Sequence, residues 1–572
     1  MSVKNGVAPR PAYQVMRLDR MGSSFQTRLS FMRSLVRRMS RENWSFERLR
    51  FDVDEQGFGT SVYAAVTPKR TYSLVAFTND LDSEERTDRV IAEAWDATFS
   101  LFDGIPSEKD LERLRRNTTK QEAGRFLPSE LVLSRANKSL RLFEHVVNHL
   151  AQGMQPDLDL LASVGYLMRT TAVYGSGKFG SADREKIAGR SETQGAFQVE
   201  MLNVYLVRWF TIDLVEHIAH SKGGLTAVPL APEYRRFLGI GNATGLGMAP
   251  FLVNHPLLVH KWVKARETAL ARIRNLEYPS QDTLEVFDQL LQGVQIHVSE
   301  WKVEDVKQTV CIEKLAQELK LLQDEFAERR NWKLKFFWEQ LFQFAETHFS
   351  LEGQELMVAL LIEPHGYLVD DLADEMYSED EMRFDPRMSL ERLRQLIEEN
   401  YDWALNIDFG HQEENRQFWY YSEEKLEPRL GIRNVDPGSE WEIPLAVGRD
   451  VSELYNELGK STEYRSAGEF VLAHPERRHS ARRVQALSNF PYSEIRDNLV
   501  GVGMRPTDLL RFKLAFFGAT KFDPKSDLWT RITMFQGAPM PDELKTSNSD
   551  AWAFPVRPDM YHEPAIGNPF AK

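Results

Sequence analysis

Three glycines in the middle of the chain have the spacing of a phosphate-binding turn. They are Gly175, Gly177 and Gly180, and Ser176 and Lys178 lie between them. The pattern is G-x-G-x-x-G, and it stands between a strand-like run and a polar helix start, which is the order that a dinucleotide-binding turn requires. Backbone N–H groups at such a helix start, together with a lysine, suit an anion. The segment is therefore predicted to bind a phosphate or a carboxylate.

The two best-defined nucleotide-binding motifs match this segment only in part. A dinucleotide-binding unit needs an acidic residue about 20 residues further on, and Glu200 has that distance but falls inside an apolar helical pattern. A Walker A loop needs Ser or Thr after its lysine, where this chain has Phe179, and a glycine where it has Ala172. A nucleotide-type cofactor, another anion site and a structural turn all stay open, and no cofactor is assigned.

Charged residues stand on both sides of this first glycine segment. Arg169 precedes it on the strand-like run, while Asp183 and Arg184 open the helix-like stretch after it. An arginine that points into such a site would hold a carboxylate or phosphate with two parallel hydrogen bonds. Asp183 is the reserve candidate for acid–base chemistry. The alternative for these residues is a set of surface ion pairs.

A second glycine segment follows about sixty residues later, in the stretch LGIGNATGLGMAP. Such glycine density is entropically unfavourable unless the backbone needs positive φ angles or must approach something closely. We interpret the segment as a substrate-binding loop, and the alternative is a tight crossover between helices and a strand. Its candidate binding residues are Gly239, Gly241, Asn242, Thr244 and Gly245.

His255 is the candidate general acid–base residue. Pro256 follows it and is well suited to the first position of a helix, so His255 should lie at a helix start. The helix dipole disfavours imidazolium there, which suits proton transfer near neutral pH. Each glycine segment therefore precedes a helix start, and anion binding at paired helix starts is the simplest common purpose.

Histidine spacing does not predict a metal site. His145 and His149, and likewise His217 and His220, share helix faces, but no H-E-x-x-H motif occurs. The acidic stretch 370–381 is typical of a solvated surface. A His/carboxylate metalloenzyme remains a second alternative for the function.

The composition excludes several classes of protein. The 572 residues carry a formal net charge of -13, which argues against nucleic acid or an anionic membrane as the main partner. No run approaches the ~20 apolar residues of a membrane span, and the N-terminus lacks the apolar stretch of a secretory signal. The single cysteine rules out a disulfide within the chain. We expect a soluble, cytoplasmic protein, although a targeting role for residues 20–41 stays open.

The periodicity predicts a helix-rich α+β chain in four parts. Residues 1–127 should form an α+β domain, with strands between 49 and 77 and a helix over 83–104. Residues 128–350 should form a mostly helical domain that carries the two glycine loops, with one long helix over 129–153. Residues 351–536 should form a second α+β domain with a buried strand over 355–364, and residues 537–572 an extended Pro-rich tail.

Two functions from different classes follow from these features. The first is an enzyme that acts on a small anionic substrate, phosphorylated or carboxylated, or on a nucleotide-type cofactor. The second is a helical scaffold or assembly subunit, in which the basic first helix and the acidic stretch 370–381 are complementary patches. The aromatic tail would then join copies of the chain into a homo-oligomer.

Overall fold

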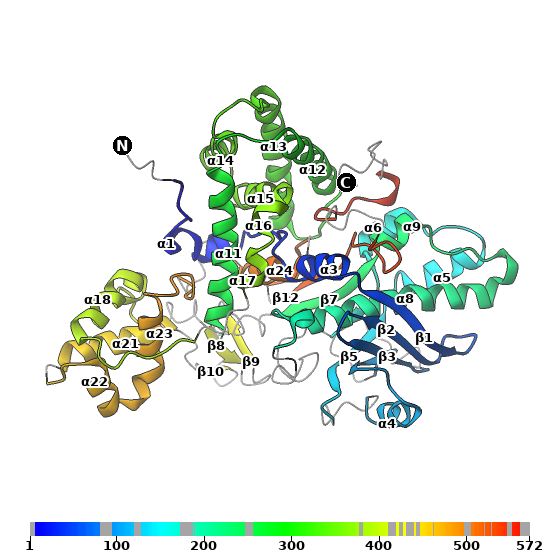
Figure 1. The fold of residues 1–572 in the computed structure, drawn as a ribbon, viewed down its shortest axis with the longest axis horizontal. Helices are drawn as coiled ribbons and strands as arrows, with labels where there is room; N and C mark the ends of the chain where they lie inside the picture. Colours follow the sequence, from blue (N-terminus) through cyan, green and yellow to red (C-terminus); the bar gives the residue numbers. More distant parts are fainter. Residues whose placement is uncertain are drawn as a thin grey trace.

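The computed structural model describes most of the chain. The described residues are 6–80, 94–118, 127–171, 187, 189–245, 255–376, 381–409, 419–422, 427–430, 440–441, 447–461, 463–496, 505–519, 521–527, 529–545 and 552–560. The fold is mixed α/β with 54% helix, built around a nine-stranded sheet (Figure 1). Among the described residues, no helix combines the length and apolarity that crossing a membrane requires.

The large sheet is antiparallel except at one strand pair, β6 and β7, which run parallel. Its order is β1-β2-β3-β4-β5-β6-β7-β12-β11. The strands are β1 (Ser45–Val53), β2 (Gly59–Val66), β3 (Thr71–Thr78), β4 (Ala97–Asp103), β5 (Glu130–Lys138), β6 (Tyr166–Thr170), β7 (Gly239–Gly245), β11 (Asp523–Ser526) and β12 (Trp529–Met534). A small three-stranded sheet holds β8 (Trp419–Ser422), β9 (Glu427–Leu430) and β10 (Glu440–Trp441).

Helix α8 (Gln198–Gly223) packs against one face of the large sheet and connects β6 to β7. The sequence predicts this buried central helix, because its residues are apolar on most sides. Phe210 of α8 meets Tyr63 of β2 and Phe99 of β4 edge-on, with ring centroids 6.0 and 5.6 Å away. The opposite face carries α4 (Glu108–Thr118) over a smaller apolar cluster that includes Val75 and Leu114.

The remaining helices stack above the sheet and form a lobe at one side (Figure 1). The helices near the N-terminus and the sheet are α1 (Ala12–Val15), α2 (Leu18–Met21), α3 (Phe31–Arg41), α5 (Phe143–Ala151), α6 (Leu158–Val164) and α9 (Pro232–Phe237). The upper stack is α11 (Pro256–Arg274), α12 (Gln281–Ser299), α13 (Val306–Arg329), α14 (Phe337–His348), α15 (Leu351–Ile362), α16 (Gly366–Val369) and α17 (Leu372–Glu375), with α24 (Leu509–Phe517) beneath it. The side lobe holds α18 (Leu390–Asn400), α19 (Asp402–Leu405), α21 (Val447–Lys460), α22 (Ala467–Ala473) and α23 (Arg478–Ala486).

The large sheet draws strands from three of the predicted parts of the chain. β1 to β4 come from 1–127, β5 to β7 from 128–350, and β11 and β12 from 351–536. The predicted boundaries at 127 and 350 therefore do not separate one sheet from another.

Three element predictions are wrong. The expected helix over 129–153 is β5 followed by α5, and the second half of the expected helix over 83–104 is β4. Both strands are buried on their two faces, so they lack the alternation that marks a half-buried strand. The expected strand over 355–364 lies in α15, since a continuous apolar run is equally typical of a buried helix.

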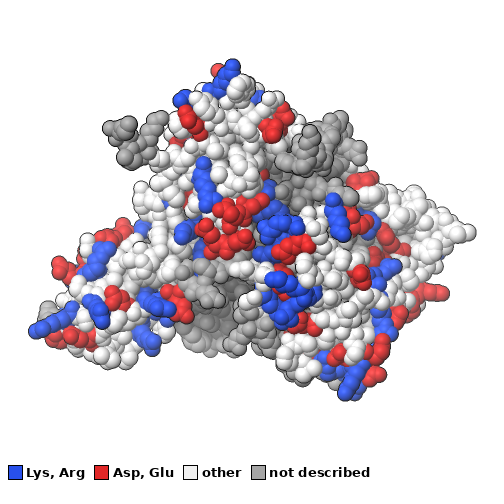
Figure 2. Space-filling view, in the orientation of Figure 1, with Lys and Arg blue, Asp and Glu red and all other residues white. Residues whose placement is uncertain are grey.

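The basic N-terminal segment pairs with acidic residues of the same chain. Arg28 and Arg37 contact Asp370 at 2.7 and 3.5 Å, and Arg33 contacts Glu363 at 2.7 Å. Figure 2 shows an acidic group over α16 and α17 with basic side chains beside it. The two patches expected to join different subunits therefore meet within one chain.

The described part of the Pro-rich tail also packs on its own chain. Trp552 is 1% exposed, stacks on Phe535 and lies against the Arg33 guanidinium. The Gln26 side-chain amide donates to the backbone oxygen of Ala553 at 2.5 Å. As far as residue 560, the described part of the tail therefore buries its aromatic side chains against its own chain.

Candidate functional site

The parallel strands β6 and β7 set the geometry around the two glycine segments. Tyr166 pairs with Gly239 and Arg169 with Gly241, so both strands end at the same edge of the sheet. The first glycine segment leaves β6 at this edge, and the chain after β7 leaves it there too. In parallel α/β units, ligands bind beyond the carboxyl ends of the strands.

Most of the first glycine segment lies outside the described residues. This holds for Gly175, Ser176, Gly177, Lys178, Gly180, Asp183 and Arg184. Their assignment to an anion site stays a prediction.

The second glycine segment is a strand as far as Gly245, so the prediction of a loop there is wrong, while its part in binding a substrate stays a prediction. Gly239, Gly241 and Gly245 lie in β7, between β6 and β12. A Cβ at Gly239 would lie 2.3 Å from the backbone oxygen of Met534, and a Cβ at Gly241 would lie 2.7 Å from the Tyr166 ring. Because glycine has no side chain, Gly239 and Gly241 let β6 and β12 pack closely against β7. This packing explains the glycines at these positions without a bound ligand.

The two polar residues of this segment are also placed by the sheet. The Asn242 side chain donates to the backbone oxygen of Thr170 at 2.8 Å, so it ties β7 to β6. The backbone of Thr244 pairs with Thr530 of β12. Neither observation gives these residues a part in binding a substrate.

Arg169 lies on the sheet face away from α8. It is 6% exposed and pairs in register with Asn137 of β5. Thr98 and Arg135, which pair with each other on β4 and β5, share this face. The face is apolar beneath α4 and carries polar and basic side chains toward β6, and the role of Arg169 as an anion ligand stays a prediction.

His255 stands where the sequence places it, as the residue that precedes the first turn of α11, with Pro256 at the first helical position. It lines a small cavity together with Lys513 of α24. The other lining residues are apolar: Phe197, Leu258, Val259, Phe516 and Phe517. The space open to the centre of a water-sized sphere is about 10 Å³, which is room for about one water molecule.

The residues that precede two helices line this cavity. Phe197 precedes α8 and His255 precedes α11, and neither helix has a side-chain cap. The first N–H groups of an uncapped helix have no partner within the helix, and the helix dipole adds positive potential there. Phe197 has a φ of 60°, a left-handed conformation that costs energy for a residue with a side chain. Its ring packs against Phe31 and Phe517, which hold it in place.

Lys513 supplies a titratable amine inside apolar surroundings. Its side chain is buried, with a residue exposure of 1%, and Nζ lies 5.1 Å from the centre of the Phe517 ring. Burial lowers the pKa of Lys513 to about 7, because the apolar cavity solvates the ammonium form poorly. At neutral pH both protonation states are therefore populated.

Two residues that line the cavity, Lys513 and Phe197, are not among the candidates that the sequence predicts. The signal for Lys513 was a single lysine at the centre of the apolar helix LLRFKLAFF. A charged side chain in such a run is buried at a cost and therefore marks a candidate site. Phe197 carried no signal in the sequence, because its role depends on a backbone angle.

The histidine pairs do not form metal sites with the described residues around them. The rings of His145 and His149 lie 3.9 Å apart, but His145 accepts the backbone N–H of Asp157 and His149 contacts the backbone oxygen of His145. His217 contacts the backbone oxygen of Asp54. These histidines therefore serve local structure.

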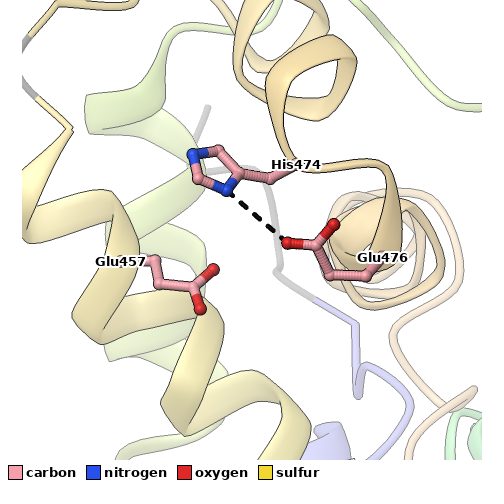
Figure 3. Close-up of side chains that lie close together, drawn as sticks. All are labelled: Glu457, His474 and Glu476. Carbon is pink, nitrogen blue, oxygen red and sulfur yellow. Dashed lines mark ion pairs between the residues drawn. The ribbon is translucent and has the colours of Figure 1, made fainter.

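Among the described residues, one group of side chains has the spacing that metal ligands need. Glu457 of α21, His474 and Glu476 offer ligand atoms within 4.8 Å of one another (Figure 3). However, Arg477 donates to both oxygens of Glu457, at 2.8 and 2.5 Å. The guanidinium supplies the positive charge that a metal would bring, so we interpret this group as an ion-pair network.

Comparison with known proteins finds no family model, no curated protein and no solved structure that matches this chain.

Proposed function

We propose that this chain is an enzyme acting on a small anionic substrate, phosphorylated or carboxylated, whose anionic group binds at the starts of α8 and α11. The observation that supports this proposal is the meeting of Lys513 with two uncapped helix starts at one cavity. Each of these features favours negative charge, and an apolar wall strengthens their effect by lowering the local dielectric.

The roles follow from the chemistry of the two polar side chains. Lys513 binds the anion when it is protonated and accepts a proton when it is neutral. His255 is exposed at the start of α11 and serves as the general acid–base residue toward the substrate. Arg169 lies on the sheet face away from α8 and is not part of this site; with the segment 175–180 it stays a predicted ligand for an anion at the carboxyl end of β6.

Thermal shift with a panel of phosphorylated and carboxylated metabolites, including inorganic phosphate, tests the proposal. A ligand of the native state raises the apparent melting temperature. We expect a stabilising anion for the wild type that is more effective at pH 6 than at pH 8, because the ammonium form of Lys513 binds it.

A matched pair of lysine variants gives the control. Lys513→Met removes the buried amine, whereas Lys222→Met removes an exposed lysine at the end of α8 that pairs with Glu144 at 3.2 Å. The anion effect should disappear in the first variant and persist in the second. An undiminished shift in folded Lys513→Met protein would refute the proposed site.

A further inference from the structure

We propose that β1 is the interface of a homodimer, in which the β1 strands of two copies pair antiparallel and join their large sheets into one. β1 is the outermost strand at one edge of the sheet, and among the described residues β2 is the only strand that pairs with it. The outer side of β1 therefore offers backbone N–H and C=O groups to a strand from another molecule.

The two edges of the large sheet differ in how they discourage such pairing. The opposite edge strand, β11, has four residues and contains Pro524, and both features hinder pairing with another chain. β1 has nine residues and no proline, and the side chains of Ser45, Glu47 and Leu49 are exposed. The β1 edge is therefore the one that can accept a further strand.

On the side of α8, β1 carries two half-buried aromatic rings. Phe46 packs edge-on against Trp209, and Phe51 packs edge-on against His217, with ring centres 6.4 and 5.3 Å apart. A β1 strand from a second copy would cover these rings with its own pair of phenylalanines. Burial of this apolar surface would favour the association.

On the side of α4, β1 carries charges of both signs. Arg50 contacts Glu108 of α4 at 3.0 Å. Glu47 also lies on this side, because side chains alternate along a strand and Phe46 faces α8. Glu47 is exposed, and within the described part of the chain it has no ion-pair partner. An open groove of about 360 Å³ between β1 and α4 leaves room beside Arg50 for a side chain of a second copy.

One two-fold register matches both sides of β1 at once. When two strands pair antiparallel about a point between residues 48 and 49, Glu47 of each copy lies opposite Arg50 of the other, and Phe46 lies opposite Phe51. The irregularity of β1 at this point keeps the opposed side chains on the same face. A shift by one residue would put Arg50 opposite Phe46, or Glu47 opposite Phe51. The charges of β1 therefore select a second copy of the same strand.

Two single substitutions on the full chain test the inference. Light scattering during size-exclusion chromatography should give twice the chain mass for the wild type. It should give the mass of one chain for Glu47→Arg and for Arg50→Glu, because each variant brings like charges together twice. Glu313→Arg makes the same charge change at an exposed position of α13 and should leave the dimer intact.

A mixture of Glu47→Arg and Arg50→Glu gives the sharper result. In a mixed dimer the new arginine lies opposite the new glutamate, and the native Arg50 of one copy lies opposite the native Glu47 of the other. We therefore expect the mixture to return to the dimer mass, although each variant alone is monomeric. A monomeric wild type, a dimer that neither substitution weakens, or a mixture that stays monomeric would overturn the inference.

Discussion

Lys513 lines a small apolar cavity together with the residues that precede α8 and α11, and its buried amine is poorly solvated. In the unfolded chain the same amine is fully hydrated and keeps its ordinary pKa near 10.5. At a pH between these two pKa values, the amine loses a proton when the chain folds. The free energy of unfolding of the wild type therefore rises with pH from about 7 to 10.5.

Replacing this lysine with methionine should stabilise the protein in acid. Lys513→Met keeps most of the side-chain volume and removes the cost of the buried charge. At pH 6 we expect a gain of about 3–5 kcal/mol in the free energy of unfolding, decreasing toward zero above pH 10. Urea unfolding at pH 6, 8 and 10 measures it. A destabilisation at pH 6 would show that the buried ammonium is favourably paired.

A methyl group at Gly239 should be costly for a reason that does not involve a ligand. Gly239→Ala places a Cβ 2.3 Å from a backbone oxygen of β12, so a strand must move. We expect a loss of about 1–3 kcal/mol. Gly293→Ala in α12 is the control, since nothing lies within 4 Å of its Cβ, and it should gain up to about 1 kcal/mol. Equal effects of the two changes, measured by urea unfolding, would contradict this explanation of the glycines.

At the scale of elements, hydrophobic periodicity predicts the helices and strands that are half-buried, and it misses those that are buried on all sides. The meander β1 to β3, the helix α8 and the start of α11 at Pro256 all follow from apolar spacing and capping residues. β4, β5 and α15 do not, because a segment buried on all sides has no polar face to mark its period. The cavity itself depends on Phe197, His255 and Lys513, which are far apart in the sequence, and no local pattern brings them together.

The N-terminal segment is attached to the helical stack by a buried ionic cluster. Glu355 of α15 contacts Arg10 and Arg20 at 3.0 and 2.8 Å and also contacts Arg266 of α11. The glutamate is fully buried, and the three guanidinium groups hold its pKa well below the usual range. Its contribution to stability is therefore present above pH 4.5 and is lost as the pH falls below that value.

Neutralising this glutamate should loosen the N-terminal segment. Glu355→Gln leaves three buried arginines with one acidic partner fewer, and we expect a loss of about 3–5 kcal/mol at pH 7. Glu399→Gln breaks an exposed pair with Arg392 at 3.1 Å and should cost at most about 1 kcal/mol. Urea unfolding of both variants tests this, and a cost at Glu355 no larger than that at Glu399 would contradict it.

At the scale of the whole molecule, the large sheet joins the two halves of the chain. β7 lies between β6 and β12, so a chain that ends before β12 would expose the backbone of β7 as an edge. The tail then closes over the same region, with Trp552 packed on Phe535. The parts of the chain that the periodicity predicts are therefore not independent, because strands from three of them form one sheet.

A fragment of residues 1–350 should therefore fail to fold as a soluble unit. It keeps β1 to β7 but lacks β11, β12 and α24, which cover one side of β7 and of the cavity. We expect aggregation or a loss of dispersed amide signals in its NMR spectrum, while the full chain stays soluble. A soluble fragment with native-like dispersion would show that the sheet is complete without its C-terminal strands.

The central claim is that Lys513 and two helix starts create a site for negative charge. The most direct measurement is the pH titration of the Lys513 ¹³Cε resonance, assigned by its absence in Lys513→Met, with and without inorganic phosphate. The account predicts a pKa near 7 without phosphate and a higher pKa with it, because a bound anion favours the ammonium form. An ordinary pKa near 10.5 that phosphate leaves unchanged would contradict it.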